Sequence, residues 1–223
     1  LADPPPVMEG KRLGLLANPA SVACPNGDGR FKPTRALIAD RFPGQLQALF
    51  SPQHGFFAEK QANMVTSEDV MDPLLKIPVF SLYDDTREPT GSMLDPIDIL
   101  LVDLQDVGTR VYTFIYTMAL SLNKARDQDK QVIVLDRPNP IGGDRLEGNC
   151  LKMAYASFVG MYPIPMRHGL TIGELALLFN EHFGIGGELS VIPMGGWKRS
   201  MLFSDTGLPW IPPSPNLPTP AST

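Results

Sequence analysis

The chain has 223 residues, of which 43% are hydrophobic and 19% are charged, and its formal net charge is −5. This composition is typical of a globular protein with a sizeable core, and an acidic balance without a basic cluster argues against nucleic acid as the main partner. No apolar run approaches the roughly 20 residues that a membrane-spanning helix needs. We therefore expect neither a nucleic-acid partner nor a membrane span.

Apolar runs and helical periods alternate along the chain. In chain order they predict a strand at 11–18, a helix at 33–42, strands at 46–50, 77–83 and 98–104, a helix at 111–127, a strand at 131–136, a helix at 170–184 and a strand at 188–194. The runs at 98–104 and 131–136 are almost continuously hydrophobic, which is typical of central parallel strands. The last helix has the clearest boundaries, because Thr171 and Glu174 form a capping box and Gly184 suits the position after the final turn.

Strands that alternate with helices predict an α/β fold, a Rossmann-like doubly wound sheet that is mainly parallel and has helices on both faces. The segment from Leu208 onward has six prolines between Pro209 and Pro220. Because proline can neither continue a helix nor donate to a sheet ladder, this segment predicts an extended linker or a wrap around the domain. We therefore divide the chain into a Rossmann-like domain at 1–207 and a proline-rich linker at 208–223, which leads towards something that this sequence lacks.

Cysteine and glycine patterns do not indicate a metal or a nucleotide. Cys24 and Cys150 are far apart and fit no zinc pattern. A disulfide between them is possible, but two buried free thiols are the favoured interpretation. No GxGxxG motif follows the first strand, and the glycine pair at 142–143 has no Walker lysine after it. We expect no metal and no cofactor.

Polar and ionisable side chains follow the predicted strands at the points where open α/β sheets bind their ligands, beyond the carboxyl ends. A purely structural domain would not need this gathering, so it favours a site for a polar ligand. In chain order these side chains are Asn18, Gln53, His54, Tyr83, Asp84, Asp85, Arg87, Asp103, Gln105, Asp106, Arg110, Tyr112, Tyr116, Asp136, Arg137 and Asn139.

Several of these residues also have structural interpretations. Asp106 can accept a hydrogen bond from its own backbone in a turn, and for one such aspartate this is the favoured interpretation. Asp136 and Arg137 can form an ion pair at a strand end, which is as well supported as a functional role. Tyr112 and Tyr116 lie on one face of the predicted helix, where core packing is the usual outcome.

The three histidines differ in context. His54 lies between a strand end and a glycine, in a loop with neither helical nor strand periodicity, so a functional role is favoured. His168, which precedes Gly169, is interpreted as a turn histidine. His182 stands near a helix end, where it complements the helix dipole.

Several long stretches in a fixed order resemble one protein family. They are SPQHGFF at 51–57, PVFSLYDDTREPT at 78–90, DLQDVGTRVYTFIYTM at 103–118, VLDRPNPIGGDRLEG at 134–148, SFVGMYPIPMRHGLTIGELALLFN at 157–180 and PPSPNLPT at 212–219. From about residue 11 to its end, the sequence resembles the DUF1343 family, the NamZ-type exo-β-N-acetylmuramidases, which are glycoside hydrolases. The resemblance implies that 1–207 is the catalytic domain and that the activity releases N-acetylmuramic acid from non-reducing ends of peptidoglycan fragments during cell-wall turnover. It also implies that the active cleft is shared with a smaller C-terminal domain.

One position departs from the family pattern. Members commonly have Pro-Glu-His-Gly where this chain has Gln53 before His54, and that glutamate is the favoured catalytic carboxylate of the family. Gln53 can neither exchange a proton as a carboxyl group does nor act as a nucleophile. The carboxylates that remain within the matching motifs are Asp106, Asp103, Asp136, Glu59 and Glu147.

The resemblance leads to a set of expected site residues. At the catalytic centre we expect Gln53, His54, Asp106 and Asp136. One of the two, Asp106 or Asp136, is expected to be the essential acid or the group that orients the substrate. His54 is expected to position the substrate or to relay a proton. A substrate-assisted route, in which the sugar's own acetamido oxygen attacks C1, would need only an acid and a group that orients the amide. The expected substrate-binding residues are Asn18, Tyr83, Arg87, Arg110, Tyr112, Arg137 and Asn139.

Three further expectations follow. Arg110 is assigned to the lactyl carboxylate of the sugar, because a guanidinium binds a carboxylate through paired hydrogen bonds. The competing hypothesis is a non-catalytic protein that binds the saccharide, and Gln53 is the feature that favours it. The chain begins with Leu1, so we expect that it was cut from a longer precursor, and a cell-wall substrate favours a periplasmic or secreted location.

Overall fold

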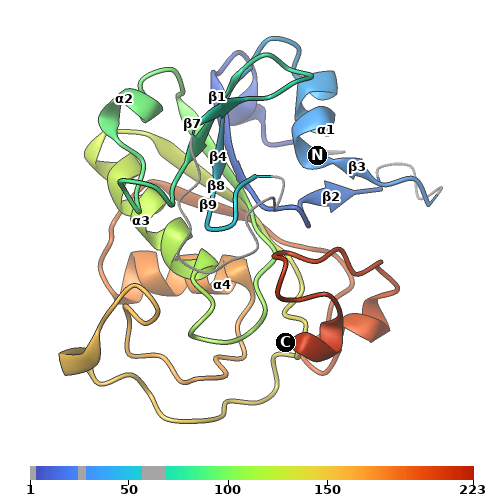
Figure 1. Ribbon diagram of the computed structural model, residues 1–223, viewed down its shortest axis with the longest axis vertical. Coiled ribbons are helices and arrows are strands. Elements are labelled where there is room, and N and C mark those ends of the chain that lie inside the picture. Colours follow the sequence, from blue (N-terminus) through green and yellow to red (C-terminus); the bar gives the residue numbers. More distant parts are fainter. Residues whose placement is uncertain (1–3, 25–28, 57–68) are drawn as a thin grey trace.

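A mixed sheet forms the centre of the molecule (Figure 1). The computed structural model describes residues 4–24, 29–56 and 69–223. Over these residues the sheet has seven strands, in the order β5-β6-β4-β1-β7-β8-β9. The parallel strands are β1 (Leu13–Ala17), β4 (Leu46–Ser51), β6 (Pro78–Ser81), β7 (Ile99–Asp103), β8 (Gln131–Leu135) and β9 (Leu189–Ile192). The short β5 (Val70–Met71) is antiparallel at the edge.

The order of the parallel strands identifies the fold. Numbered along the chain, they stand in the order 3-2-1-4-5-6, which is that of the Rossmann fold. The order reverses between β1 and β7, and ligands of such sheets bind at this crevice beyond the carboxyl ends. The predicted Rossmann-like α/β fold is confirmed.

Helices cover both faces of the sheet (Figure 1). They are α1 (Thr34–Arg41), α2 (Gly91–Leu94), α3 (Phe114–Asp127) and α4 (Ile172–Leu177), which a π-helical turn extends over Leu178–His182. Successive residues of a strand point to opposite faces. Along β1, Leu15 therefore joins the core beneath α1, whereas Leu16 joins the core beneath α3 and α4. Both are fully buried, which explains why this strand is apolar throughout.

The predicted elements are present, with ends that shift by a few residues. The predicted helix at 111–127 begins at Phe114, because Tyr112 N–H instead donates to Thr109 in a preceding turn. The predicted capping box is confirmed. Thr171 Oγ1 accepts from the Glu174 N–H at 3.2 Å, and the Thr171 N–H donates to Glu174 Oε2 at 3.0 Å.

Among the residues that the structure describes, only short elements were not predicted. They are the hairpin of β2 (Val22–Ala23) and β3 (Lys32–Pro33), the edge strand β5, helix α2, and 3-10 turns at Pro6–Met8, Met153–Tyr155, Phe203–Thr206 and Pro220–Ser222.

The proline-rich segment folds back onto the sheet domain, beside the β2–β3 hairpin (Figure 1). The Trp210 ring meets Phe203 edge-on at 4.9 Å between centroids, and its Nε1 donates to the Leu217 carbonyl at 3.0 Å. Ser214 is 1% exposed. These contacts hold part of the segment against the body of the domain. The division of the chain after residue 207 stays a prediction.

Two other expectations can be compared with the structure. Cys24 and Cys150 are free thiols, as favoured, but the expectation that both are buried is wrong, because Cys24 is half-buried and Cys150 is exposed. In the described part of the chain, no helix has the length and apolar character needed to cross a bilayer.

Candidate active site

Amide side chains connect the loops at the crevice where the strand order reverses. Asn18 follows β1, and its Nδ2 donates to the Gln105 carbonyl at 3.1 Å. Gln105 follows β7, and its Nε2 donates to the carbonyls of Asp106 at 2.7 Å and Pro138 at 2.9 Å. Because Asn18 and Gln105 are both buried, these bonds fix the ends of three neighbouring strands relative to one another.

A buried ion pair lies directly behind this crevice. Arg137 Nε donates to Asp103 Oδ1 at 2.5 Å and Nη2 donates to Oδ2 at 2.9 Å. Thr34, the first residue of α1, donates its hydroxyl to the same Oδ2 at 2.5 Å. Burial lowers the pKa of the Arg137 guanidinium, but the charge and hydrogen bonds of Asp103 outweigh burial and raise it. The suggested ion pair between Asp136 and Arg137 is wrong, since Arg137 pairs with Asp103.

The Asp136 carboxylate caps helix α4. Its Oδ1 accepts from the backbone N–H groups of Arg137 at 3.0 Å and Gly173 at 2.8 Å, and Oδ2 accepts from the Thr171 hydroxyl at 3.0 Å. Burial raises the pKa of Asp136, and the three hydrogen bonds oppose that rise. Both oxygens are thus committed to the protein's own groups at a helix N-terminus, a favourable place for a carboxylate.

Asp106 is more deeply buried than Asp136 and less completely bonded. Its Oδ2 accepts from the Gly108 N–H at 2.8 Å, which is the turn that the sequence favoured. The Nε2 atom of His168 lies 3.2 Å from the same Oδ2. Within residues 4–24, 29–56 and 69–223, nothing donates a hydrogen bond to Oδ1. Asp106 and His168 are 3% and 1% exposed, so this is a buried carboxylate with a vacant acceptor oxygen.

Gly108 allows the Asp106 turn to pack closely. Its φ is +84°, which favours glycine. A Cβ atom there would lie 2.4 Å from Asn139 Oδ1 and 2.5 Å from Ile141 Cγ1. Asn139 has little freedom to move away, because Nδ2 donates to Leu170 and Oδ1 accepts from the Ile141 N–H. Asn139 therefore supports the turn that holds Asp106.

Two more predicted residues follow this turn. Arg110 directs Nη1 to the carbonyls of Asn149 at 2.7 Å and Ile164 at 2.9 Å, and thereby ties down the long segment after β8. Burial raises the pKa of the Tyr112 hydroxyl, and the charge of Asp106 adds to that rise while Ser214 opposes it.

The loop after β4 carries Gln53 and His54. Gln53 Oε1 accepts from the Thr113 hydroxyl at 3.3 Å, so this side chain reaches the residue just before α3. His54 is 6% exposed and has a φ of +80°, and Gly55 after it has the same value. A non-glycine residue with positive φ is uncommon and strained, and such residues cluster at functional sites. Glu59 lies outside the described residues.

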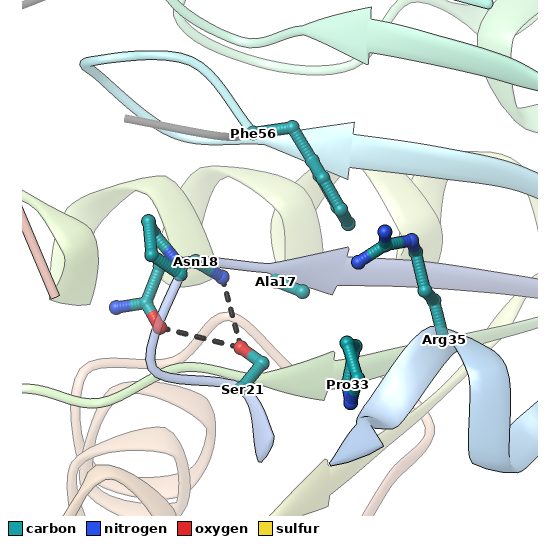
Figure 2. Close-up of a pocket in the computed structure, with 7 residues that line it drawn as sticks. Ala17, Asn18, Ser21, Pro33, Arg35 and Phe56 are labelled. Carbon is teal, nitrogen blue, oxygen red and sulfur yellow. Dashed lines mark hydrogen bonds between the residues drawn. The ribbon is translucent and has the colours of Figure 1, made fainter. Parts of the chain in front are cut away.

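A cavity of about 200 Å³ opens beside Asn18, on the face of the sheet that α1 covers (Figure 2). It is lined by Ala17, Asn18, Pro19, Ser21, Pro33, Arg35 and Phe56. The Arg35 guanidinium lies 5.6 Å from the Phe56 ring centroid, and its Nε is 2.9 Å from Asp72 Oδ2. Ser21 Oγ accepts from the Asn18 N–H and donates to Asn18 Oδ1.

Tyr83 and Arg87 form a separate stack after β6. The Arg87 guanidinium carbon lies 3.7 Å from the Tyr83 ring centroid, and Nη1 donates to the Asp84 carbonyl at 2.7 Å. The Tyr83 ring also lies 6.0 Å from that of Phe158. No described contact links this stack to Asp106, and no group of three or more His, Cys, Asp or Glu among the described residues is arranged to hold a metal.

Sequence reasoning gave His168 no functional role. Its Nδ1 does accept from the Leu170 N–H, as a turn histidine would, but Nε2 faces Asp106. No local signal pointed to this contact, because the two residues are far apart in the sequence and neither shows periodicity. The role of Asp103 as partner of Arg137 was missed for the same reason.

Comparison with known proteins places the chain in a family. A family profile described as "Exo-beta-N-acetylmuramidase NamZ, N-terminal" matches residues 13–221. The chain belongs to this NamZ family. It is 48% identical to "Peptidoglycan beta-N-acetylmuramidase NamZ" of Bacillus subtilis (strain 168), over 97% of this chain and 51% of that protein.

Two crystal structures of DUF1343 family proteins from Bacteroides fragilis share the NamZ-family fold described above. One superposes with a TM-score of 0.86 at 42% identity and the other with a TM-score of 0.76 at 33% identity. They are matched over 97% and 96% of this chain, and over 53% and 54% of their own lengths. The chain therefore spans about half the length of the relatives that it matches.

Proposed function

We propose that this chain is the N-terminal part of a glycoside hydrolase of the exo-β-N-acetylmuramidase type, which releases N-acetylmuramic acid from non-reducing ends of peptidoglycan fragments. The observation that carries the proposal is the 48% identity to the peptidoglycan β-N-acetylmuramidase of B. subtilis across 97% of the chain. The Rossmann strand order adds support, because the polar side chains gather at the crevice where such sheets bind ligands. The saccharide is the partner in this proposal, and the other cleft wall is a C-terminal domain.

Of the two aspartates assigned to catalysis, Asp106 is the better candidate for the essential group. Both carboxylate oxygens of Asp136 are committed to capping α4. In contrast, Oδ1 of Asp106 accepts no hydrogen bond from any described group. A buried acceptor of this kind is costly unless a ligand supplies a hydrogen, so Asp106 is suited to orient or protonate a substrate group.

Gln53 fits a substrate-assisted route better than a route with an enzyme nucleophile. Gln53 offers no carboxylate to attack C1, whereas the acetamido oxygen of N-acetylmuramic acid is part of the substrate and can attack, with a carboxylate such as Asp106 accepting from the acetamido N–H. His54, in a loop with positive φ beside Gln53, is then assigned to position the sugar or to transfer a proton. Because Nη1 of Arg110 donates to two backbone carbonyls, a lactyl carboxylate would have to accept from the other guanidinium nitrogens of Arg110.

A chromogenic muramide, incubated with the full-length protein, tests the proposal directly. We expect release of the chromophore by the wild type and a loss of at least about 10²-fold in kcat for Asp106→Asn, the scale of acid–base catalysis. Asp136→Asn should mainly lower stability.

The saccharide-binding alternative rests on Gln53 and gives a different result. In that case calorimetry detects binding of N-acetylmuramic acid by the wild type without chromophore release, and Gln53→Glu gains hydrolysis. Absence of both release and binding in the wild type would refute the two hypotheses together.

A further inference from the structure

His168 is held rigidly by the chain around it. Its N–H donates to the Gly108 carbonyl at 3.3 Å, and its Nδ1 accepts from the Leu170 N–H at 3.2 Å. Gly169, which follows it, has a φ of +64°, and a Cβ atom there would lie 2.9 Å from the Arg145 carbonyl oxygen. The imidazole is 1% exposed, so neither its backbone nor its ring is free to reorient.

The hydrogen bond at Nδ1 determines the tautomer of His168. Because Nδ1 accepts a hydrogen bond, it carries no proton, and the proton of the neutral ring is on Nε2. The Nε2 atom, which carries this proton, lies 3.2 Å from Asp106 Oδ2. Although the two atoms are close, Nε2 makes no well-aligned hydrogen bond among the described residues. Contacts between catalytic groups are often misaligned before substrate binds and tighten in the complex.

The two oxygens of Asp106 thus have unequal surroundings. Oδ2 has the Gly108 N–H at 2.8 Å and the His168 Nε2–H at 3.2 Å. Oδ1 has no donor within the described residues, although it is buried. A carboxylate with one oxygen bonded to the Gly108 N–H and packed against His168 Nε2 has little freedom to rotate, and its second oxygen then has a defined direction.

From this arrangement we infer that His168 is a positioning residue of the proposed hydrolase, which orients Asp106 so that Oδ1 receives an N–H or O–H group of the sugar. The inference rests on the proposed function. It assigns to His168 a role in the reaction, exerted through Asp106 and without contact to the substrate. The alternative is that His168 serves only the turn, through Nδ1.

Two substitutions of His168 separate these roles. In His168→Asn the side-chain oxygen can take the place of Nδ1 and keep the bond to the Leu170 N–H, but nothing reaches Asp106. In His168→Gln the longer amide can place an N–H near the position of Nε2 and keep the contact to Asp106. Both are made in the full-length protein and assayed with the chromogenic muramide below the unfolding temperature of each variant. His182→Asn, at an exposed histidine near the end of the π-helical turn, is the matched control.

The positioning role predicts that His168→Asn loses about 10²-fold in kcat, the scale of a misplaced reacting group, whereas His168→Gln stays within about tenfold of the wild type. The double variant Asp106→Asn/His168→Asn should be no slower than Asp106→Asn alone, since His168 acts through Asp106. His182→Asn should match the wild type.

Retained activity in folded His168→Asn, or equal losses in the Asn and Gln variants, would overturn the inference and leave the proposed function standing. If His168→Asn fails to fold, the test rests on His168→Gln. A loss of kcat well beyond tenfold in folded His168→Gln then overturns the inference. A wild type that neither hydrolyses the muramide nor binds the sugar would overturn both the proposed function and the role of His168.

Discussion

Replacing Gly108 by alanine tests the packing beneath Asp106. The substitution lowers the free energy of unfolding for two reasons. The positive φ of +84° costs about 1–2 kcal/mol for a residue with a Cβ atom. The methyl group would also lie 2.4 Å from Asn139 Oδ1 and 2.5 Å from Ile141 Cγ1, and overpacking of a buried site costs about 1–3 kcal/mol. We therefore expect Gly108→Ala to lower the free energy of unfolding by about 2–5 kcal/mol.

The control for this prediction is Gly44→Ala. Gly44 has a φ of +72°, but a Cβ atom there would have nothing within 4 Å, so only the backbone cost of about 1–2 kcal/mol applies. Urea unfolding of the chain, followed by tryptophan fluorescence, gives both free energies if the m values agree. The difference between the variants then measures the clash with Asn139 and Ile141. If the two variants lose equal stability, the proposed rigid support of Asp106 by Asn139 is refuted.

Three further predictions concern stability. Arg137→Met should lower the free energy of unfolding by about 3–5 kcal/mol, because it leaves Asp103 charged, buried and unpaired. The double variant Arg137→Met/Asp103→Asn should recover part of this loss in urea unfolding, and no recovery would argue against the ion pair. Thr171→Ala should cost about 1 kcal/mol through loss of the helix cap, and an unchanged urea midpoint would contradict that role. The hydrogen bonds of Arg12 lower the pKa of Asp98 to about 2, below its usual value, so the pair stabilises the fold above about pH 4 and loses this effect as the pH falls towards 2. Asp98→Asn should therefore be less stable than the wild type at pH 6 but not at pH 2, and a difference independent of pH would contradict this cause.

The main architecture could be predicted because its signals are local. Residues 99–102 and 132–135 are continuous apolar runs, since each lies in the middle of a sheet covered on both faces. The Thr171–Glu174 capping box is likewise a short-range pattern. The hairpin of β2 and β3 could not be found this way, because two-residue strands are too short to show a period.

Pairing between distant residues could not be predicted from local pattern. Asp136 and Arg137 are neighbours in the sequence, which suggested an ion pair between them. In extended backbone, however, successive side chains point to opposite sides, so Arg137 turns towards Asp103 at the end of the adjacent strand β7. The contact between Asp106 and His168 is of the same kind, because the fold alone brings these residues together.

The bond between Thr34 and Asp103 has a consequence for what this Rossmann sheet can bind. In dinucleotide-binding relatives of the fold, a helix begins directly after the first strand, and its positive N-terminal end receives the pyrophosphate. Here β1 ends at Ala17, the β2–β3 hairpin intervenes, and α1 begins at Thr34, whose hydroxyl donates to Asp103. At the start of α1 the Asp103 carboxylate therefore stands where the pyrophosphate would be, and its charge is paired with Arg137. The start of α1, which in those relatives receives a phosphate group, is here engaged by an internal carboxylate, so a pyrophosphate could not bind there in the same way.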